Sequence, residues 1–100
     1  MNKSTQIKQI LAKIKMAKII KHLSANPQSK TLKQIVRYSQ KAWESEDQEE
    51  VSKLAVRVAY YLDVICDPNK AGYVKNENEK KYWLEISQKL FENTIGAKQK

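Results

Sequence analysis

DQEEVSKLAVRVAYYLDVIC, residues 47–66, has the apolar pattern of a long helix that is buried on most of its sides. Six apolar residues recur at the helical period and form one face: Val51, Leu54, Ala55, Val58, Leu62 and Ile65. Five more widen this face: Val56, Ala59, Tyr60, Tyr61 and Val64. A helix that is apolar on most of its circumference needs neighbours on several sides. We therefore expect a central core helix about 30 Å long.

Both ends of this helix are marked in the sequence. Two overlapping capping boxes begin at Ser45 and Asp47, and in such boxes side chains bind the free N–H groups of the first turn. The acidic residues at 44–50 also favour the positive end of the helix dipole. Pro68 disfavours a helical conformation in the residue before it. These signals place the helix at 47–66.

Three further segments have helical periodicity, and they predict an all-α fold. They are residues 5–24, 28–44 and 77–93. Asn26 can cap the second of them, and the proline that follows it, Pro27, is tolerated in a first helical turn. Asn76 and Glu79 have capping-box spacing before the last. Four helices with short links pack most simply as an antiparallel bundle. We predict a single-domain antiparallel four-helix bundle over residues 1–100, with a frayed tail at 94–100.

The second segment divides cleanly into two sides. One side is mostly apolar: Leu32, Ile35, Val36, Ser39, Ala42 and Trp43. The other side carries Lys30, Lys33, Arg37 and Lys41, which we expect to face solvent. In the last segment, the inner stripe consists of Trp83, Ile86 and Leu90.

The apolar residues of the first segment change face partway along. Ile7, Ile10, Leu11 and Ile14 share one face, whereas Met16, Ile19, Ile20 and Leu23 lie nearly opposite, at about 100° per residue. Three explanations are open. The helix bends or breaks near Lys15, its two halves bury different sides, or only one half packs. In the last case the other half is a basic amphipathic segment that can meet a membrane or a partner.

The net charge of +8 is unevenly distributed along the 100 residues. Residues 1–43 contain nine lysines and Arg37 but no Asp or Glu, whereas residues 44–100 carry a net charge of −2. Such segregation suggests a polyanion near the N-terminal half: nucleic acid, an anionic membrane surface or an acidic protein. The alternative is a lysine-rich solvated surface. With no apolar run long enough to span a bilayer, and one cysteine, we expect a cytoplasmic protein.

The inventory of chemically reactive residues predicts a protein that is not an enzyme, with no catalytic residues, metal or cofactor. The single histidine, His22, lies near a helix C-terminus, where a cation is stabilised without any catalytic role. Asp63 and Asp67 flank Cys66 and would raise the pKa of its thiol, which disfavours a reactive thiolate. The acidic residues at 44–50 lack the alternation of a calcium loop. No phosphate-binding loop or hydrolase motif occurs, and we expect no small-molecule substrate.

Over residues 5–96, the layout of the chain resembles the immunity proteins against pediocin-like (class IIa) bacteriocins. The most similar part is VSKLAVRVAYYLDVI, followed by a polar loop, the pair Tyr73-Val74 and an acidic-capped last helix, NENEKKYWLEISQKL. The chain departs from the family in its short tail after Gly96 and in the change of face in its first helix. The resemblance implies a basic, intracellular, antiparallel four-helix bundle.

The resemblance also implies a function in self-protection. Such a protein would recognise, from the cytoplasmic side, a sugar-transporter receptor occupied by bacteriocin, and would block the lethal pore. In the family the C-terminal half sets specificity, which implicates five residues here as partner-binding: Lys70, Tyr73, Lys75, Lys80 and Lys81.

The residues themselves add a second candidate site and two other function classes. Five N-terminal lysines could bind an anionic surface and give peripheral contact with the inner side of the membrane: Lys8, Lys13, Lys15, Lys18 and Lys21. The alternative function is a small basic nucleic-acid-binding or regulatory helical protein of phage or plasmid type that uses the same lysines. The second segment offers Gln34, Arg37 and Gln40 for base contacts, but no helix-turn-helix signature is evident. A partner-binding adaptor or homodimer is the third class.

Overall fold

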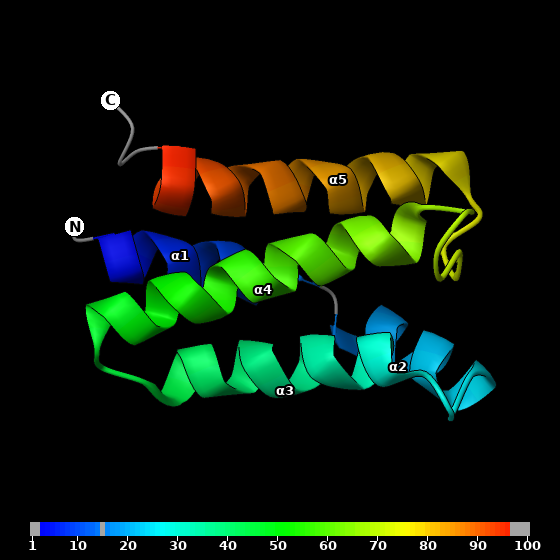
Figure 1. Ribbon diagram of the computed structural model, residues 1–100, viewed down its shortest axis with the longest axis horizontal. Coiled ribbons are helices and arrows are strands. Elements are labelled where there is room, and N and C mark those ends of the chain that lie inside the picture. Colours follow the sequence, from blue (N-terminus) through cyan, green and yellow to red (C-terminus); the bar gives the residue numbers. More distant parts are fainter. Residues whose placement is uncertain (1–2, 15, 97–100) are drawn as a thin grey trace.

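The computed structural model describes residues 3–14 and 16–96, with side chains at 5–14 and 16–94. Five α-helices occupy most of this part of the chain, and it contains no strand. They are α1 (Lys3–Ala12), α2 (Met16–Ala25), α3 (Lys30–Glu44), α4 (Gln48–Cys66) and α5 (Glu77–Phe91), and a π-helical turn, η1 (Glu92–Gly96), follows α5. The predicted all-α fold is confirmed (Figure 1).

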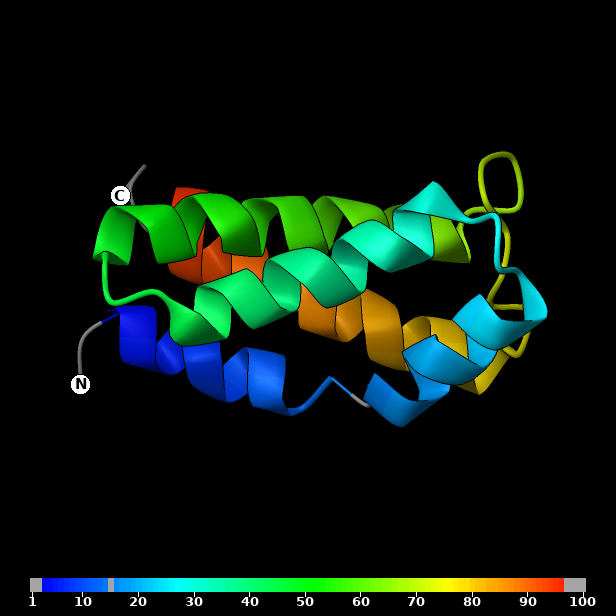
Figure 2. The same cartoon turned by 90° about the horizontal axis from the view of Figure 1, so that it is seen from below.

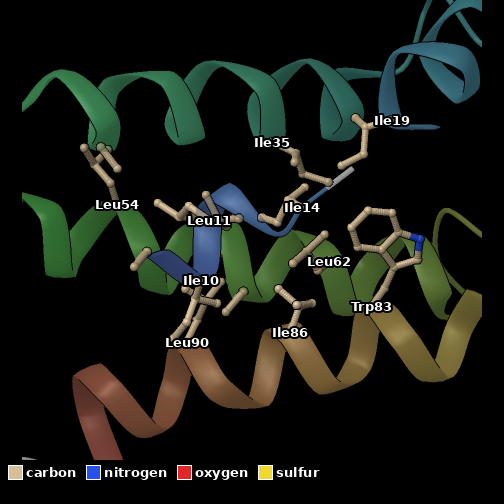
Figure 3. Packing of buried hydrophobic residues seen from close by; sticks show 14 of the residues in the cluster. Ile10, Leu11, Ile14, Ile19, Ile35, Leu54, Leu62, Trp83, Ile86 and Leu90 are labelled. Atoms are coloured by element: carbon tan, nitrogen blue, oxygen red, sulfur yellow. The ribbon is translucent and has the colours of Figure 1, made fainter. Parts of the chain in front are cut away.

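α4 runs through the middle of the bundle, as its apolar pattern predicts. It packs against α1, α3, α5 and η1. α3 and α5 lie on either side of α4 and run antiparallel to it, and α1 lies behind α4 (Figure 1). α2 continues the course of α1 towards the other end of the bundle, where it packs against α3 (Figure 2). Side chains from all five α-helices meet in one apolar cluster that includes Ile14, Ile19, Ile35, Leu62 and the fully buried Trp83 (Figure 3).

α1 and α2 are separate helices, so the break is the explanation observed for the change of face in residues 5–24, and the bundle has five α-helices where four were predicted. The N–H groups of Lys13 and Ile14 bind carbonyl oxygens three residues back, each at 3.0 Å, which tightens the last turn and ends α1. The carbonyl of Lys13 also accepts a hydrogen bond from the hydroxyl of Tyr82. The break has a simple cause: Ile14 and Ile19 are both buried, and one straight helix cannot bury opposite faces against the same core. Both halves therefore pack.

The turn between α2 and α3 uses a different cap from the one predicted. Asn26 closes the end of α2, because its side-chain amide donates to the carbonyl of His22 at 3.0 Å. Ser29 is the N-cap of α3, and its hydroxyl accepts from the N–H of Leu32 at 3.2 Å. The helix accordingly begins at Lys30 rather than at residue 28.

The caps of α4 and α5 agree with the sequence. Asp47 caps α4 by accepting from the N–H groups of Glu49 and Glu50, and Asn76 caps α5 by accepting from the N–H of Glu79 at 3.1 Å. α4 ends at Cys66, as predicted. The chain beyond Phe91 differs from the prediction of a helix to residue 93, because a π-helical turn extends to Gly96. Thr94 is buried, and its hydroxyl donates to the carbonyl of Leu90, four residues earlier in the same helical run, at 2.9 Å.

Three residues that the sequence assigns to apolar faces are instead about half exposed: Ile20, Trp43 and Tyr60. Each lies at the edge of its apolar face. Tyr60, for example, follows Arg57 by three residues, which places it on the side of α4 that also carries exposed cations.

Candidate partner-binding surface

The loop between α4 and α5, residues 67–76, is fastened to the bundle at several points. The carboxylate of Asp67 accepts from the N–H of Asn69 at 2.8 Å, which closes a tight turn. Gly72 has φ of +59°, a left-handed conformation that suits glycine. The N–H of Val74 donates to the carbonyl of Ile65 at 3.1 Å, and the side chain of Val74 is buried. The loop therefore presents its exposed side chains from a fixed backbone.

The structure brings three of the five predicted partner-binding residues to the surface at one end of the bundle: Lys70, Lys75 and Lys81. The other two have structural contacts. Tyr73 is partly buried against the core. The ammonium of Lys80 lies 3.6 Å from the carboxylate of Glu77, and the Lys80 side chain is only partly exposed. The predicted residues that remain exposed are therefore mainly the first three lysines.

A group of tyrosines beside this loop was missed by the sequence analysis. Tyr38 of α3 stacks on Tyr61 of α4 with ring centroids 6.1 Å apart, and Tyr60 meets Tyr61 edge-on at 5.5 Å. Two cations lie over these rings: Arg57 is 5.7 Å from the centroid of Tyr38, and Lys70 is 5.7 Å from that of Tyr60. We call these five residues the tyrosine cluster. In the sequence only Tyr60 and Tyr61 are neighbours, and the stacking of Tyr38 on Tyr61 arises only when α3 packs against α4.

An apolar groove lies next to the tyrosine cluster. It has a volume of about 420 Å³ and is lined by Val56, Arg57, Tyr60, Tyr61 and Phe91. Leu84, which is also exposed, lies two helical turns before Phe91 and so shares its side of α5. Aromatic rings and arginine are the residues enriched at protein–protein interfaces. The contact of Lys70 with Tyr60 joins the loop to the groove, and together they form the candidate surface.

A polar cluster ties α2 to α5. Nε2 of His22 lies 3.3 Å from Oε1 of Glu79, so the histidine has a structural contact. The pKa of Glu79 lies below its usual value: burial acts to raise it, but hydrogen bonding from His22 and the nearby N–H of Trp83, with the charge of Lys18, lower it by more. The indole nitrogen of Trp83 is near Glu79 without meeting strict hydrogen-bond geometry.

Cys66 is buried, and its surroundings oppose ionisation. Burial, together with the negative charge of Asp63, raises the pKa of its thiol to about 11. The raised pKa agrees with the sequence prediction, although burial rather than charge is the main cause. Among the described side chains, no three His, Cys, Asp or Glu residues are grouped closely enough to hold a metal ion. Across residues 3–14 and 16–96, no helix has the length and apolar character needed to cross a membrane.

The predicted anionic-surface lysines differ in their surroundings. Lys8 is partly buried, and its ammonium donates to the carbonyl of Ser45 at 2.7 Å, which fastens α1 to the link between α3 and α4. Lys13 lies at the end of α1, and Lys18 and Lys21 lie on α2, all three exposed. Lys15 lies outside the described residues.

No family model, curated protein or solved structure matches this chain.

Proposed function

We propose that this protein is a non-catalytic immunity protein that protects its cell from a pediocin-like bacteriocin. It binds the bacteriocin-occupied membrane transporter from the cytoplasmic side and closes the lethal pore. It acts by recognition, so no covalent bond is made or broken. Its partner is therefore a protein complex, and the proposal requires no cofactor.

The observation that carries this proposal is the contact of Lys70 with Tyr60. It joins the loop, whose counterpart in the family contributes to specificity, to an apolar groove with aromatic walls. A partner bound there would bury tyrosine rings at the centre, with Lys70, Lys75 and Lys81 at the rim. Buried aromatic residues supply much of the affinity of protein interfaces, and rim charges steer association. The anchored backbone of the loop reduces the entropy lost on binding.

A protection assay tests the proposal. The full chain is expressed in a bacteriocin-sensitive host, and the cells are challenged with a panel of pediocin-like peptides. We expect survival against one or two of the peptides. Exchange of residues 67–100 for those of a different immunity protein should change which peptide is resisted.

Point variants locate the surface more sharply. We expect Lys70→Gln/Lys75→Gln/Lys81→Gln to lower the tolerated bacteriocin concentration about tenfold, because each rim charge contributes up to about 1 kcal/mol. The matched control, Lys13→Gln/Lys21→Gln/Lys89→Gln, removes the same charge from exposed positions outside the loop and the groove and should protect normally. Killing by every peptide, with the protein expressed and folded, contradicts the proposed function. Equal loss in both triple variants contradicts the proposed surface.

A further inference from the structure

A second surface of the molecule carries a straight row of cations on α3. We call Lys30, Lys33, Arg37 and Lys41 the α3 stripe; all four are exposed. At about 100° per residue they fall within an arc of about 80°, and the eleven steps of helical rise from Lys30 to Lys41 give the stripe a length of about 16 Å. It lies directly opposite the buried side of α3, which carries Leu32, Ile35, Ser39 and Ala42. The four charges can therefore meet one flat surface together.

The charges of the α3 stripe are not neutralised within the protein. In the described part of the chain, none of the four cations forms a salt bridge. The nearest carboxylates are at one end, where Glu44 and Glu50 share a small hollow with Lys41. Residues 1–43 contain no acidic side chain at all, and exposed Lys21 of α2 adds a further positive charge.

Apolar side chains border the α3 stripe on one flank, and one of them, Trp43, is exposed. Val36 and Trp43 are seven residues apart and share that flank, whereas Tyr38 marks the opposite flank by stacking on α4. Trp43 is 48% exposed. A flank with exposed tryptophan beside a row of cations has the composition of a surface that rests at the level of lipid headgroups.

α2 contributes a second exposed apolar residue to this side. Lys18 lines a hollow with Asn76, Asn78, Glu79 and Tyr82, so its flank of α2 faces α5. Ile20, which is 50% exposed, lies about 160° around the helix from Lys18. Ile20 therefore lies on the flank of α2 that is turned away from α5, and α3 is the helix against which α2 packs.

We infer that the face formed by α2 and α3 binds an anionic phospholipid surface. The α3 stripe pairs with lipid phosphates, and Trp43 and Ile20 enter the headgroup layer. The phosphates of a nucleic acid would match the cations equally well, and an unpaired base would stack on Trp43, but the exposed aliphatic side chain of Ile20 would have no role. This assignment leaves out Lys8, whose ammonium is bound to Ser45, and Lys18, which faces α5, and keeps Lys21 as a neighbour of the stripe. It stands independently of the proposed protective function, because lipid binding needs neither transporter nor bacteriocin.

Vesicle sedimentation with the full chain tests this inference. The vesicles contain phosphatidylcholine and phosphatidylglycerol in equal parts, and pure phosphatidylcholine vesicles serve as the neutral reference. We expect binding to the anionic vesicles only, weakened as salt rises from about 50 to 200 mM. Lys30→Gln/Lys33→Gln/Arg37→Gln should weaken the partition coefficient about 100-fold. Lys70→Gln/Lys75→Gln/Lys81→Gln removes the same charge from the loop and α5, and should weaken it about threefold or less.

Tryptophan fluorescence gives a second measurement on the unsubstituted protein. Brominated lipid in the anionic vesicles should quench Trp43 and leave the buried Trp83 unquenched, and Trp43→Phe should remove the quenching. Three outcomes overturn the inference: no binding to anionic vesicles at low salt, equal weakening by the two triple variants, or unquenched Trp43 in the bound protein. Tighter binding to a random-sequence DNA duplex than to the vesicles at the same salt also overturns it, in favour of nucleic acid.

Discussion

Two serines, Ser39 and Ser87, are both buried within helices but differ in their hydrogen bonding. The hydroxyl of Ser87 donates to the carbonyl of Ala59 at 2.9 Å and so joins α5 to α4. The hydroxyl of Ser39, equally buried on α3, has no hydrogen-bond partner in the described part of the chain. A buried hydroxyl without a partner costs free energy, because it has lost its bonds to water.

The two substitutions to alanine should therefore change stability in opposite directions. We expect Ser39→Ala to raise the free energy of unfolding by about 1 kcal/mol, since it removes the unpaired hydroxyl and improves helix propensity. Ser87→Ala should lower it by about 1 kcal/mol. Urea denaturation of both variants beside the unsubstituted protein measures the two effects. If Ser39→Ala destabilises as much as Ser87→Ala does, the Ser39 hydroxyl has a partner after all.

At the scale of one element, the loop between α4 and α5 depends on the conformation of Gly72. A β-carbon added there would meet the Cα of Pro68 at 3.4 Å, an ordinary contact, so space is not the obstacle. The obstacle is φ of +59°, which costs most L-residues about 1–2 kcal/mol.

We therefore expect Gly72→Ala to lower the free energy of unfolding by about 1–2 kcal/mol, and Gly72→Asn to lower it by less, because asparagine tolerates the left-handed region better. Thermal unfolding of the two variants measures the difference. A loss for Asn as large as that for Ala would mean that a side chain at this position is opposed by something other than backbone strain.

Some features of a helix are determined by its own sequence, and others depend on how it packs in the fold. Asp47 and Asn76 act as the predicted caps because a cap binds N–H groups two or three residues away and needs no distant partner. The change of apolar face between Ile14 and Ile19 indicated a bend or break in the first helix, but a choice between the explanations required the packing of both halves. Ser29 displaced Asn26 as the cap of α3 because the amide of Asn26 binds back to α2 instead.

At the scale of the whole molecule, the charges of the candidate surfaces could be predicted from the sequence, but the contacts that their side chains make within the fold could not. The sequence identified the exposed loop lysines and the outward side of α3. It could not identify the bond of Lys8 to Ser45, which joins residues 37 positions apart. Nor could it identify the tyrosine cluster, because Tyr38 and Tyr61 meet only when α3 packs against α4. Contacts of this kind depend on the tertiary arrangement and leave no local signal.

The attachment of α2 to the rest of the bundle should depend on pH. Among the described helices, α2 packs against α3, and the contact of His22 with Glu79 also links α2 to α5. The pKa of Glu79 is lowered in the folded protein, as described above, so the folded state binds fewer protons than the unfolded state over this range. The stabilisation is therefore fully present above the unfolded pKa, near 4.5, and is lost as pH falls through the lower folded pKa.

Hydrogen exchange, with protection factors corrected for the intrinsic effect of pH, measures this directly. As pH falls below about 4.5, we expect the amides of α2 to lose protection before those of α3 and α4, because α2 opens locally once Glu79 is protonated. Glu79→Gln should lower the protection of α2 at neutral pH and remove most of its further loss in acid. Glu49→Gln is the matched control, since Glu49 pairs with Lys53 in a highly exposed salt bridge on α4 and should leave α2 unchanged. An α2 that keeps the same pH dependence in Glu79→Gln would show that a different carboxylate holds it to the bundle.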